Sequence, residues 1–204
     1  MQATFQRLTL ATVAVLGLAT AAHAAAASMA DVNKAAGMTV EPGKHIRFLT
    51  TKGTFEVVLF PKVAPKTVEN FIALTKKGLY NGTTFHRVIP GFVAQGGDPK
   101  SKTLPAGNQE IGTGGSGKDI ADEFSPKIKH LTGSLAMAHS QAANSASSQF
   151  YVCYKPLPML DGKYSVFGQV SKGMDVVEKL APTERDGAPV QNGKPDKMIK
   201  VTVF

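Results

Sequence analysis

The 204-residue sequence combines 43% hydrophobic with 19% charged residues, a balance typical of a globular domain that excludes a disordered chain. Its 23 basic and 15 acidic side chains give a formal net charge of +8, but the lysines are scattered, with no basic stripe interleaved with aromatic residues. We therefore expect a single domain with a basic surface that binds no nucleic acid. Because the chain contains 20 glycines and 12 prolines, we also expect many turns.

Residues 1–24 have the pattern of a secretory signal peptide. Arg7 supplies a positive charge, residues 8–22 are mostly apolar, and Ala22-His23-Ala24 fits the small-x-small cleavage pattern. A retained membrane anchor is the alternative interpretation. The apolar stretch is shorter than the roughly 20 residues that a spanning helix needs, and it is rich in Ala rather than Leu. We expect cleavage after Ala24 and no stable membrane association.

The next residues, 25–43, are Ala-rich with few large apolar side chains, so we predict a flexible mature N-terminus and a folded domain over 44–204. Residues 45–51 and 54–60 have the composition of two strands, and Lys52-Gly53 between them predicts a two-residue hairpin turn.

A helix follows this hairpin. Pro65 suits its first turn, because the N–H that proline lacks is not needed there, and Gly78 suits a left-handed end. Helical spacing predicts one core-facing stripe, formed by Val68, Phe71, Ile72 and Thr75.

The rest of the chain alternates short strand patterns with turns. Further strands are predicted at 84–89, 92–95, 135–138, 149–154, 165–170 and 199–203, a long surface loop at 96–120, and a second short helix at 175–180. Eight strands and two helices without βαβ alternation predict a mainly β fold. We expect a closed eight-stranded antiparallel β-barrel capped by the two α-helices, because closure removes exposed strand edges.

Three features could carry other chemistry. Cys153 is the single cysteine and lies in an apolar run, so we interpret it as a buried small hydrophobe rather than a nucleophile. The histidines lack the spacing of metal ligands. Residues 114–118 faintly resemble a phosphate loop, but the first glycine is displaced and Asp119 follows the lysine. We therefore expect neither a metal nor a cofactor.

The segment 85–98, FHRVIPGFVAQGGD, closely resembles the signature of the cyclophilin family. Three further segments agree with the family in order and spacing: APKTVENF at 64–71, SQFYV at 148–152 and LDGKYSVFG at 160–168. The resemblance covers roughly 45–204 and implies a cyclophilin-like fold with peptidyl-prolyl cis/trans isomerase activity. The short central loop and the secretion signal are similar to those of the bacterial periplasmic branch, so we expect the protein in the periplasm.

The reaction implied by this resemblance is rotation about the peptide bond before proline in unfolded or partly folded polypeptides. The amide barrier is about 18–20 kcal/mol, and uncatalysed exchange takes roughly tens to hundreds of seconds. To reach a turnover of about 1–10³ s⁻¹, the enzyme must therefore lower the activation barrier by roughly 3–7 kcal/mol. A reduction of this size requires no nucleophile, metal or cofactor.

The resemblance also implies site residues. Arg87 matches the family's catalytic arginine, and its guanidinium is a preorganised hydrogen-bond donor that stays charged. Without the resemblance, the simpler interpretation of Arg87 would be a surface arginine in a salt bridge. The other matching residues are implied to bind substrate: Phe92, Val93, Tyr151 and Leu160 in an apolar proline pocket, Gln95 and Gln149 as hydrogen-bonding groups, Ala138-His139 as a strand edge, and His86, Met159 and Tyr164 around them.

Two positions depart from many eukaryotic members of the family. Met159 stands where those members carry a tryptophan, and Tyr164 where they carry a histidine. We still expect isomerase activity with these changes, but they predict weak cyclosporin binding. The remaining alternative is a non-catalytic chaperone that binds proline-containing segments on the same fold. In either case we expect a monomer.

Overall fold

The computed structural model describes residues 24–185, 188–189 and 194–204. Its main feature is one antiparallel sheet with the strand order β10-β1-β2-β7-β5-β6-β4-β3. The strands are β1 (His45–Thr50), β2 (Gly53–Leu59), β3 (Arg87–Ile89), β4 (Val93–Gly96), β5 (Ser134–Met137), β6 (Phe150–Cys153), β7 (Val166–Lys172) and β10 (Met198–Val203). Each lies within one or two residues of a predicted strand, or inside it, so the mainly β class is confirmed.

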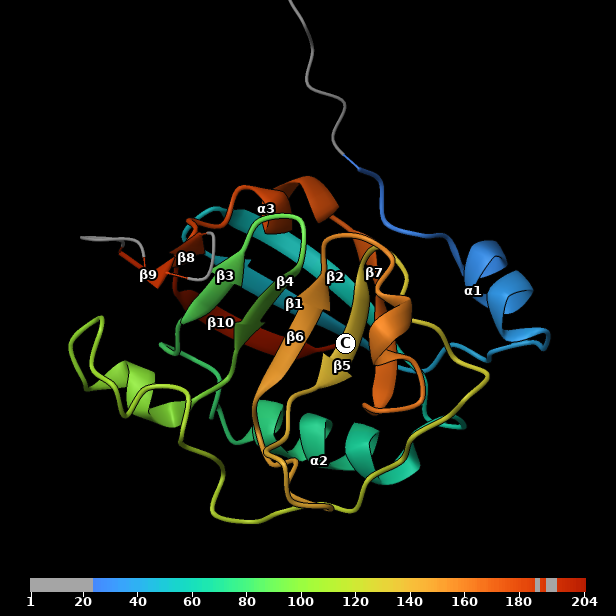
Figure 1. Ribbon diagram of the computed structural model, residues 1–204, viewed down its shortest axis with the longest axis horizontal. Helices are drawn as coiled ribbons and strands as arrows, with labels where there is room; N and C mark the ends of the chain where they lie inside the picture. The colour runs from blue at the N-terminus through green and yellow to red at the C-terminus, as the bar shows by residue number, and fades with distance from the viewer. Residues whose placement is uncertain (1–23, 186–187, 190–193) are drawn as a thin grey trace, which may run out of the picture.

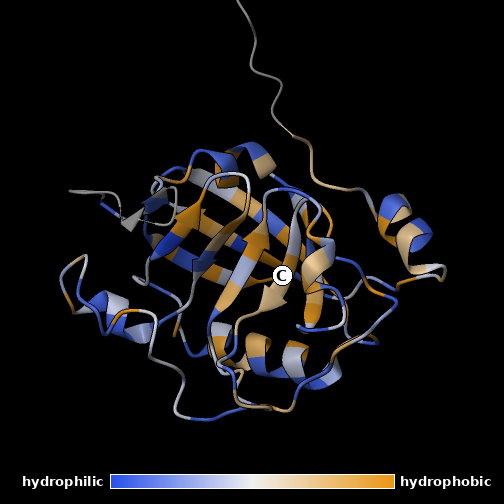
Figure 2. Ribbon diagram, viewed as in Figure 1, coloured by the Kyte–Doolittle hydropathy of each residue, from blue (hydrophilic) through white to orange (hydrophobic). Residues whose placement is uncertain are grey.

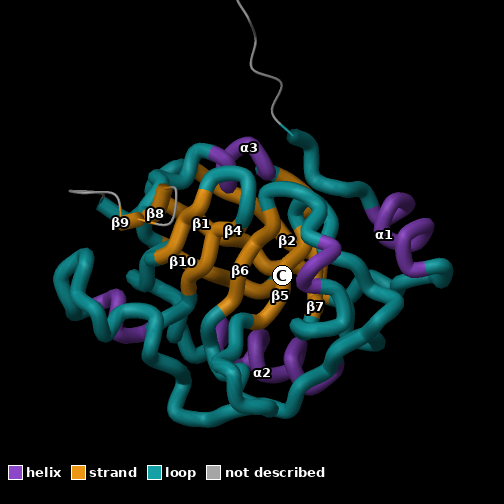
Figure 3. The backbone as a smooth tube through the Cα atoms, in the orientation of Figure 1, coloured by secondary structure: helices purple, strands orange, loops and turns teal. Residues whose placement is uncertain are grey.

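The sheet curls into a half-barrel, as the tube in Figure 3 shows. A closed barrel was expected, but β10 and β3 are the two edges of the sheet and share no ladder. Main-chain hydrogen bonds join the chain beside these edges, from the Phe85 N–H to the Asp196 carbonyl at 2.9 Å and from the Met198 N–H to the Thr83 carbonyl at 2.8 Å. These contacts surround one isolated bridge, between Thr84 and Lys197, and form no continuous ladder.

Strand alternation sends one set of side chains into an aromatic core. Phe48 and Phe55 stack with ring centroids 4.5 Å apart, and Phe150 meets Phe71 edge to face at 5.4 Å. All four side chains are fully buried. Figure 2 shows how strongly apolar residues concentrate in the strands that surround this core.

Two helices follow the sequence prediction closely. Helix α2 (Pro65–Lys76) begins with Pro65 and is followed by Gly78 at a φ of 69°, in the left-handed conformation that glycine adopts readily. It lies across one end of the curled sheet (Figure 1), and its predicted stripe is buried or partly buried against the core. Helix α3 (Met174–Glu178) overlaps the predicted 175–180.

A third helix was not predicted. Within residues 25–43, expected to be a flexible mature N-terminus, α1 (Met29–Ala36) has a complete capping box. The Ser28 hydroxyl accepts from the Asp31 N–H, and the Asp31 carboxylate accepts from the Ser28 N–H. Val32 is buried against the outer side of the sheet, so an Ala-rich composition concealed a short amphipathic stripe. The described residues thus form three α-helices rather than two.

Two further details differ from the prediction. The β1–β2 turn consists of Thr51 and Lys52, one residue earlier than expected, because Thr50 pairs with Gly53. A small hairpin of β8 (Glu184–Arg185) and β9 (Ala188–Pro189) lies outside the main sheet.

The predicted signal peptide lies outside the described residues except for Ala24, so its cleavage stays a prediction. Within the described ranges, the helices are too short to cross a membrane.

Candidate functional site

The register of three strands places the predicted polar and aromatic site residues in one line. Arg87 of β3 lies opposite Gln95 of β4, and Gln95 lies opposite Tyr151 of β6. Tyr151 in turn lies opposite Ala136 of β5. Directly paired residues point to the same face of a sheet, and successive residues point to opposite faces. This row of Arg87, Gln95, Tyr151 and Ala136 therefore occupies the outer face, while Phe150 points into the core.

The apolar candidates gather around this row. Val93 and Tyr151 are 3% and 4% exposed and belong to one hydrophobic cluster on the outer face. Phe92, Ala138, Leu160 and Tyr164 are partly buried members of the same cluster. Tyr164 meets Tyr151 edge to face at 5.7 Å. The result is a buried apolar floor bordered by partly exposed side chains, which suits a small ring such as that of proline.

Arg87 lies at the end of the row that is formed by the edge strand β3. Its side chain is 42% exposed, and its Nε donates to the Glu184 Oε2 at 3.1 Å. Main-chain bonds hold the segment before Glu184 beside β3, since the Thr183 N–H donates to the Val88 carbonyl. The salt bridge of the simpler interpretation is therefore present. It engages Nε on one side of a guanidinium that has five donors and remains accessible to solvent.

Gln95 and Gln149 meet each other. The Gln95 Nε2 donates to the Gln149 Oε1 at 3.0 Å, and the Gln149 Nε2 donates to the carbonyls of Gly112 and Gly114, both at 2.8 Å. Gln149 is only 9% exposed, so its amide lies largely out of contact with solvent. The structure assigns it to anchoring the long loop beside the row, which leaves Gln95 nearer to Arg87.

The predicted strand edge at Ala138-His139 is partly occupied. The Ala138 N–H donates to the Gln149 carbonyl at 3.0 Å, so it is not free to pair with a substrate. The His139 ring lies between the carbonyls of Ser140 and Lys163 and packs against Tyr164 at 4.5 Å. His139 therefore belongs to the rim.

Two further candidates are not part of the paired row. His86 is half-buried beneath the loop at Gly112, and burial lowers its pKa. In the described part of the chain, neither of its ring nitrogens has a hydrogen-bond partner. Met159 lies in the 3₁₀ turn Pro158–Leu160 and is 58% exposed. Substrate contact by either residue stays a prediction.

Cys153 is fully buried at the end of β6, and burial raises the pKa of its thiol well above the usual range. The thiolate is therefore disfavoured, and the interpretation of Cys153 as a small hydrophobe is confirmed.

Sequence reasoning missed His130. Its Nε2 lies 3.0 Å from the Tyr151 hydroxyl and its Nδ1 lies 3.0 Å from the Asp161 Oδ1. The spacing of these residues follows neither a helical nor a strand period, so the sequence gives no signal for their contact.

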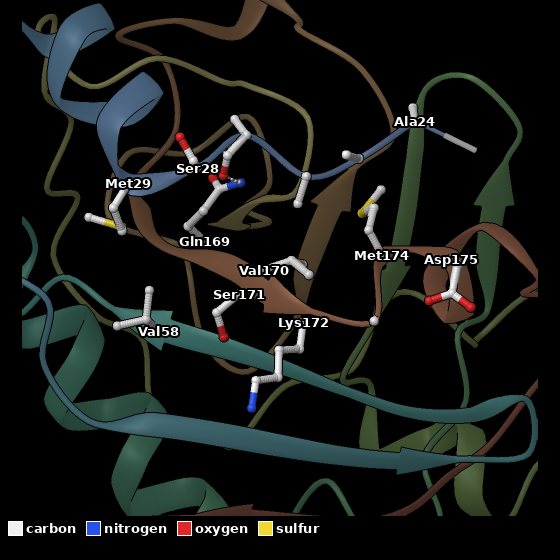
Figure 4. Close-up of a pocket in the computed structure, with 14 residues that line it drawn as sticks. Ala24, Ser28, Met29, Val58, Gln169, Val170, Ser171, Lys172, Met174 and Asp175 are labelled. Carbon is white, nitrogen blue, oxygen red and sulfur yellow. Dashed lines mark hydrogen bonds between the residues drawn. The ribbon is translucent and has the colours of Figure 1, made fainter. Parts of the chain in front are cut away.

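A cavity of about 610 Å³ lies elsewhere, between residues 24–29 and the C-terminal part of β7 with the start of α3 (Figure 4). Its walls include Gln169, Lys172 and Asp175 but no residue of the row. The labelled polar groups come from separate walls and do not converge on a common point. We therefore place the candidate active site at the row and not in this cavity.

The site combines a charged donor with an apolar floor on the outer face of a curled antiparallel sheet. This combination suits a peptidyl-prolyl isomerase, because rotation about the peptide bond needs orientation and electrostatic stabilisation but no nucleophile. The family comparison agrees with this class. The model of the cyclophilin type peptidyl-prolyl cis-trans isomerases matches residues 45–203, and the chain belongs to that family.

Related sequences and solved structures also point to the cyclophilin-type isomerases. A Brucella suis protein named "Probable peptidyl-prolyl cis-trans isomerase" is 41% identical over 169 residues, which cover 80% of this chain and 84% of the relative. A Synechococcus elongatus "Peptidyl-prolyl cis-trans isomerase" is 43% identical over 138 residues, covering 67% and 88%. A Cryptosporidium parvum cyclophilin type isomerase, solved in the presence of the dipeptide Ala-Pro, matches with a TM-score of 0.67 at 32% identity, covering 78% of this chain and 98% of that one.

Proposed function

We propose that this isomerase rotates X-Pro bonds at the row on the outer face, with Arg87 as its catalytic residue. The observation that carries the proposal is the register, which sets the half-exposed Arg87 guanidinium in line with Gln95 and the buried Tyr151 ring. A proline ring on the apolar floor would bring its amide nitrogen toward the charged end of the row.

The chemistry asked of Arg87 is electrostatic. As the amide twists, its nitrogen regains a lone pair and the resonance of the C–N bond is lost. A guanidinium keeps its charge at every physiological pH and offers donors in a fixed plane, so it stabilises that lone pair more than it stabilises the planar ground state. Removing one such donor typically lowers a rate by about 10²–10³-fold, or roughly 3–4 kcal/mol, which matches the modest acceleration that the reaction needs.

The substrates we propose are proline-containing segments of unfolded or partly folded secreted proteins, handled by a periplasmic monomer. The signal-peptide pattern at 1–24 supports this location, and it supports placement in the bacterial periplasmic branch of the family. The presence of Ala-Pro with the Cryptosporidium relative supports recognition of proline itself. We also propose weak cyclosporin binding, because the exposed Met159 thioether cannot donate the hydrogen bond that an indole N–H can.

The second candidate function is a chaperone that binds proline segments without turnover. Arg87 favours the enzyme, since a binding module gains little from a half-exposed guanidinium held beside an apolar floor. Isomerisation of a short X-Pro peptide by the purified protein distinguishes the two. The enzyme accelerates exchange catalytically, whereas a chaperone only shifts the cis/trans ratio of the peptide that it binds.

A further inference from the structure

A buried polar chain runs beneath the floor of the candidate site. The Tyr151 hydroxyl lies 3.0 Å from the His130 Nε2, and the His130 Nδ1 lies 3.0 Å from the Asp161 Oδ1. His130 is 1% exposed and Tyr151 is 4% exposed. The two rings are almost parallel, at an interplanar angle of 9°. These contacts join β6 to two separate loops.

The partners of Asp161 fix the direction of these hydrogen bonds. Its Oδ1 also accepts from the His130 main-chain N–H at 2.8 Å, and its Oδ2 lies 3.6 Å from the Lys129 ammonium. A carboxylate surrounded by donors acts as an acceptor, so the His130 Nδ1 carries the proton and its Nε2 is the acceptor. The Tyr151 hydroxyl must then donate to Nε2.

This arrangement also links the floor of the site to its rim. Asp161 directly follows Leu160, a partly buried member of the apolar cluster, and ends the 3₁₀ turn that carries the exposed Met159. A phenylalanine ring in place of Tyr151 would need no such partner, whereas a buried hydroxyl without an acceptor is strongly disfavoured. The hydroxyl therefore makes the position of the ring depend on His130.

We propose that His130 and Asp161 are positioning residues that hold the Tyr151 ring in place as the floor of the proline site and tie that floor to the rim. The proposal rests on the proposed function of the row as the X-Pro site. Neither residue touches the reacting amide in this scheme. Because Gln95 separates Arg87 from Tyr151 in the row, loss of the chain from Tyr151 to Asp161 weakens substrate binding more than it slows rotation.

Protonation of His130 would reverse the hydrogen bond at Nε2, since both ring nitrogens then donate and the Tyr151 hydroxyl must accept. Besides Tyr151, the titratable groups that face this chain are Asp161 and Lys129 on the flanking loops, Tyr164 at the rim and Cys153 on β6. Burial lowers the pKa of His130 despite the opposing effect of Asp161. The neutral arrangement is thus complete above the ordinary histidine pKa of about 6.5 and is lost as pH falls through the lowered value.

A double-mutant cycle tests the coupling. The variants are His130→Leu, Tyr151→Phe and the double substitution, assayed for KM and kcat with a short Ala-Pro peptide. We expect His130→Leu to raise KM about tenfold with kcat within twofold of the wild type, and to change KM less than twofold in the Tyr151→Phe background. Tyr154→Phe is the matched control, because it removes a buried hydroxyl bound to the Val177 carbonyl on the core side. We expect it to leave KM within twofold.

Nitrogen-15 NMR of the wild type gives a readout that does not depend on folding of the variants. At pH 7.5 we expect the His130 Nδ1 to be protonated and its Nε2 to be unprotonated. The opposite tautomer, or equal effects of His130→Leu in both backgrounds, overturns the positioning role while leaving the proposed function intact. A wild type without isomerase activity overturns both, so the two failures are distinguishable.

Discussion

The pairing of Arg87 with Glu184 makes a quantitative prediction. Their Nε and Oε2 atoms are 3.1 Å apart, but the side chains are 42% and 27% exposed, so solvent screens the interaction. Pairs of this kind contribute about 0.2–1 kcal/mol. That free energy is the most that Glu184 can contribute to holding the guanidinium in its working orientation. Since about 1.36 kcal/mol corresponds to a tenfold change in rate, the upper limit for this contribution is about fivefold.

Glu184→Ala should therefore lower kcat by up to about fivefold with little change in KM, because the guanidinium loses orientation while the apolar floor is untouched. Glu184→Gln should stay within about twofold of the wild type, because its amide oxygen still accepts from Nε. The unfolding free energy of both variants should fall by less than about 1 kcal/mol.

The assay is steady-state isomerisation of an X-Pro peptide at low ionic strength, combined with chemical denaturation of each variant. An Ala variant as active as the wild type would show that Arg87 needs no orientation by Glu184. Equal losses in the Ala and Gln variants would show that the charge of Glu184, rather than its hydrogen bond, matters.

Three further predictions concern separate regions. Met159→Trp should tighten cyclosporin binding by roughly ten- to a hundredfold, since an indole adds both packing and an N–H donor; titration calorimetry that finds equal affinities would reject our interpretation of this position. Ser28→Ala should lower the unfolding free energy by about 0.5–2 kcal/mol through loss of the α1 cap, and a denaturation midpoint identical to that of the wild type would refute the capping box. Mass spectrometry of the exported protein should find an N-terminus at Ala25, and a chain that still begins at Met1 would argue against cleavage.

The strands could be predicted from local patterns such as alternation, whereas the site residues were predicted from the resemblance to the cyclophilin family. In β1 the burial pattern alternates residue by residue, and the same period of two puts Tyr151 and Phe150 on opposite faces. Once the strands were placed, the match of residues 85–98 to the family signature set Arg87 and Gln95 on the site. Sheet closure was not predictable in this way, because it depends on how far β3 and β10 approach one another in space.

What the sequence missed depends on contacts between distant segments. Glu184 lies 97 positions from Arg87, and His130 reaches Tyr151 only because two loops fold under β6. No local period encodes such contacts. Helix α1 is a different case, since Ser28 and Asp31 form a readable S-x-x-D capping pattern before a short apolar stripe. Its Ala-rich setting led us to expect a flexible segment there.

The central claim is that Arg87 is the catalytic group of an X-Pro isomerase, and one comparison tests it most directly. The kcat/KM of the wild type and of Arg87→Ala should be measured with the same X-Pro peptide, with circular dichroism as a check on folding. We expect a folded Arg87→Ala protein whose kcat/KM is about 10²–10³-fold lower than that of the wild type. A well-folded variant that keeps a near-wild-type kcat/KM would contradict the account.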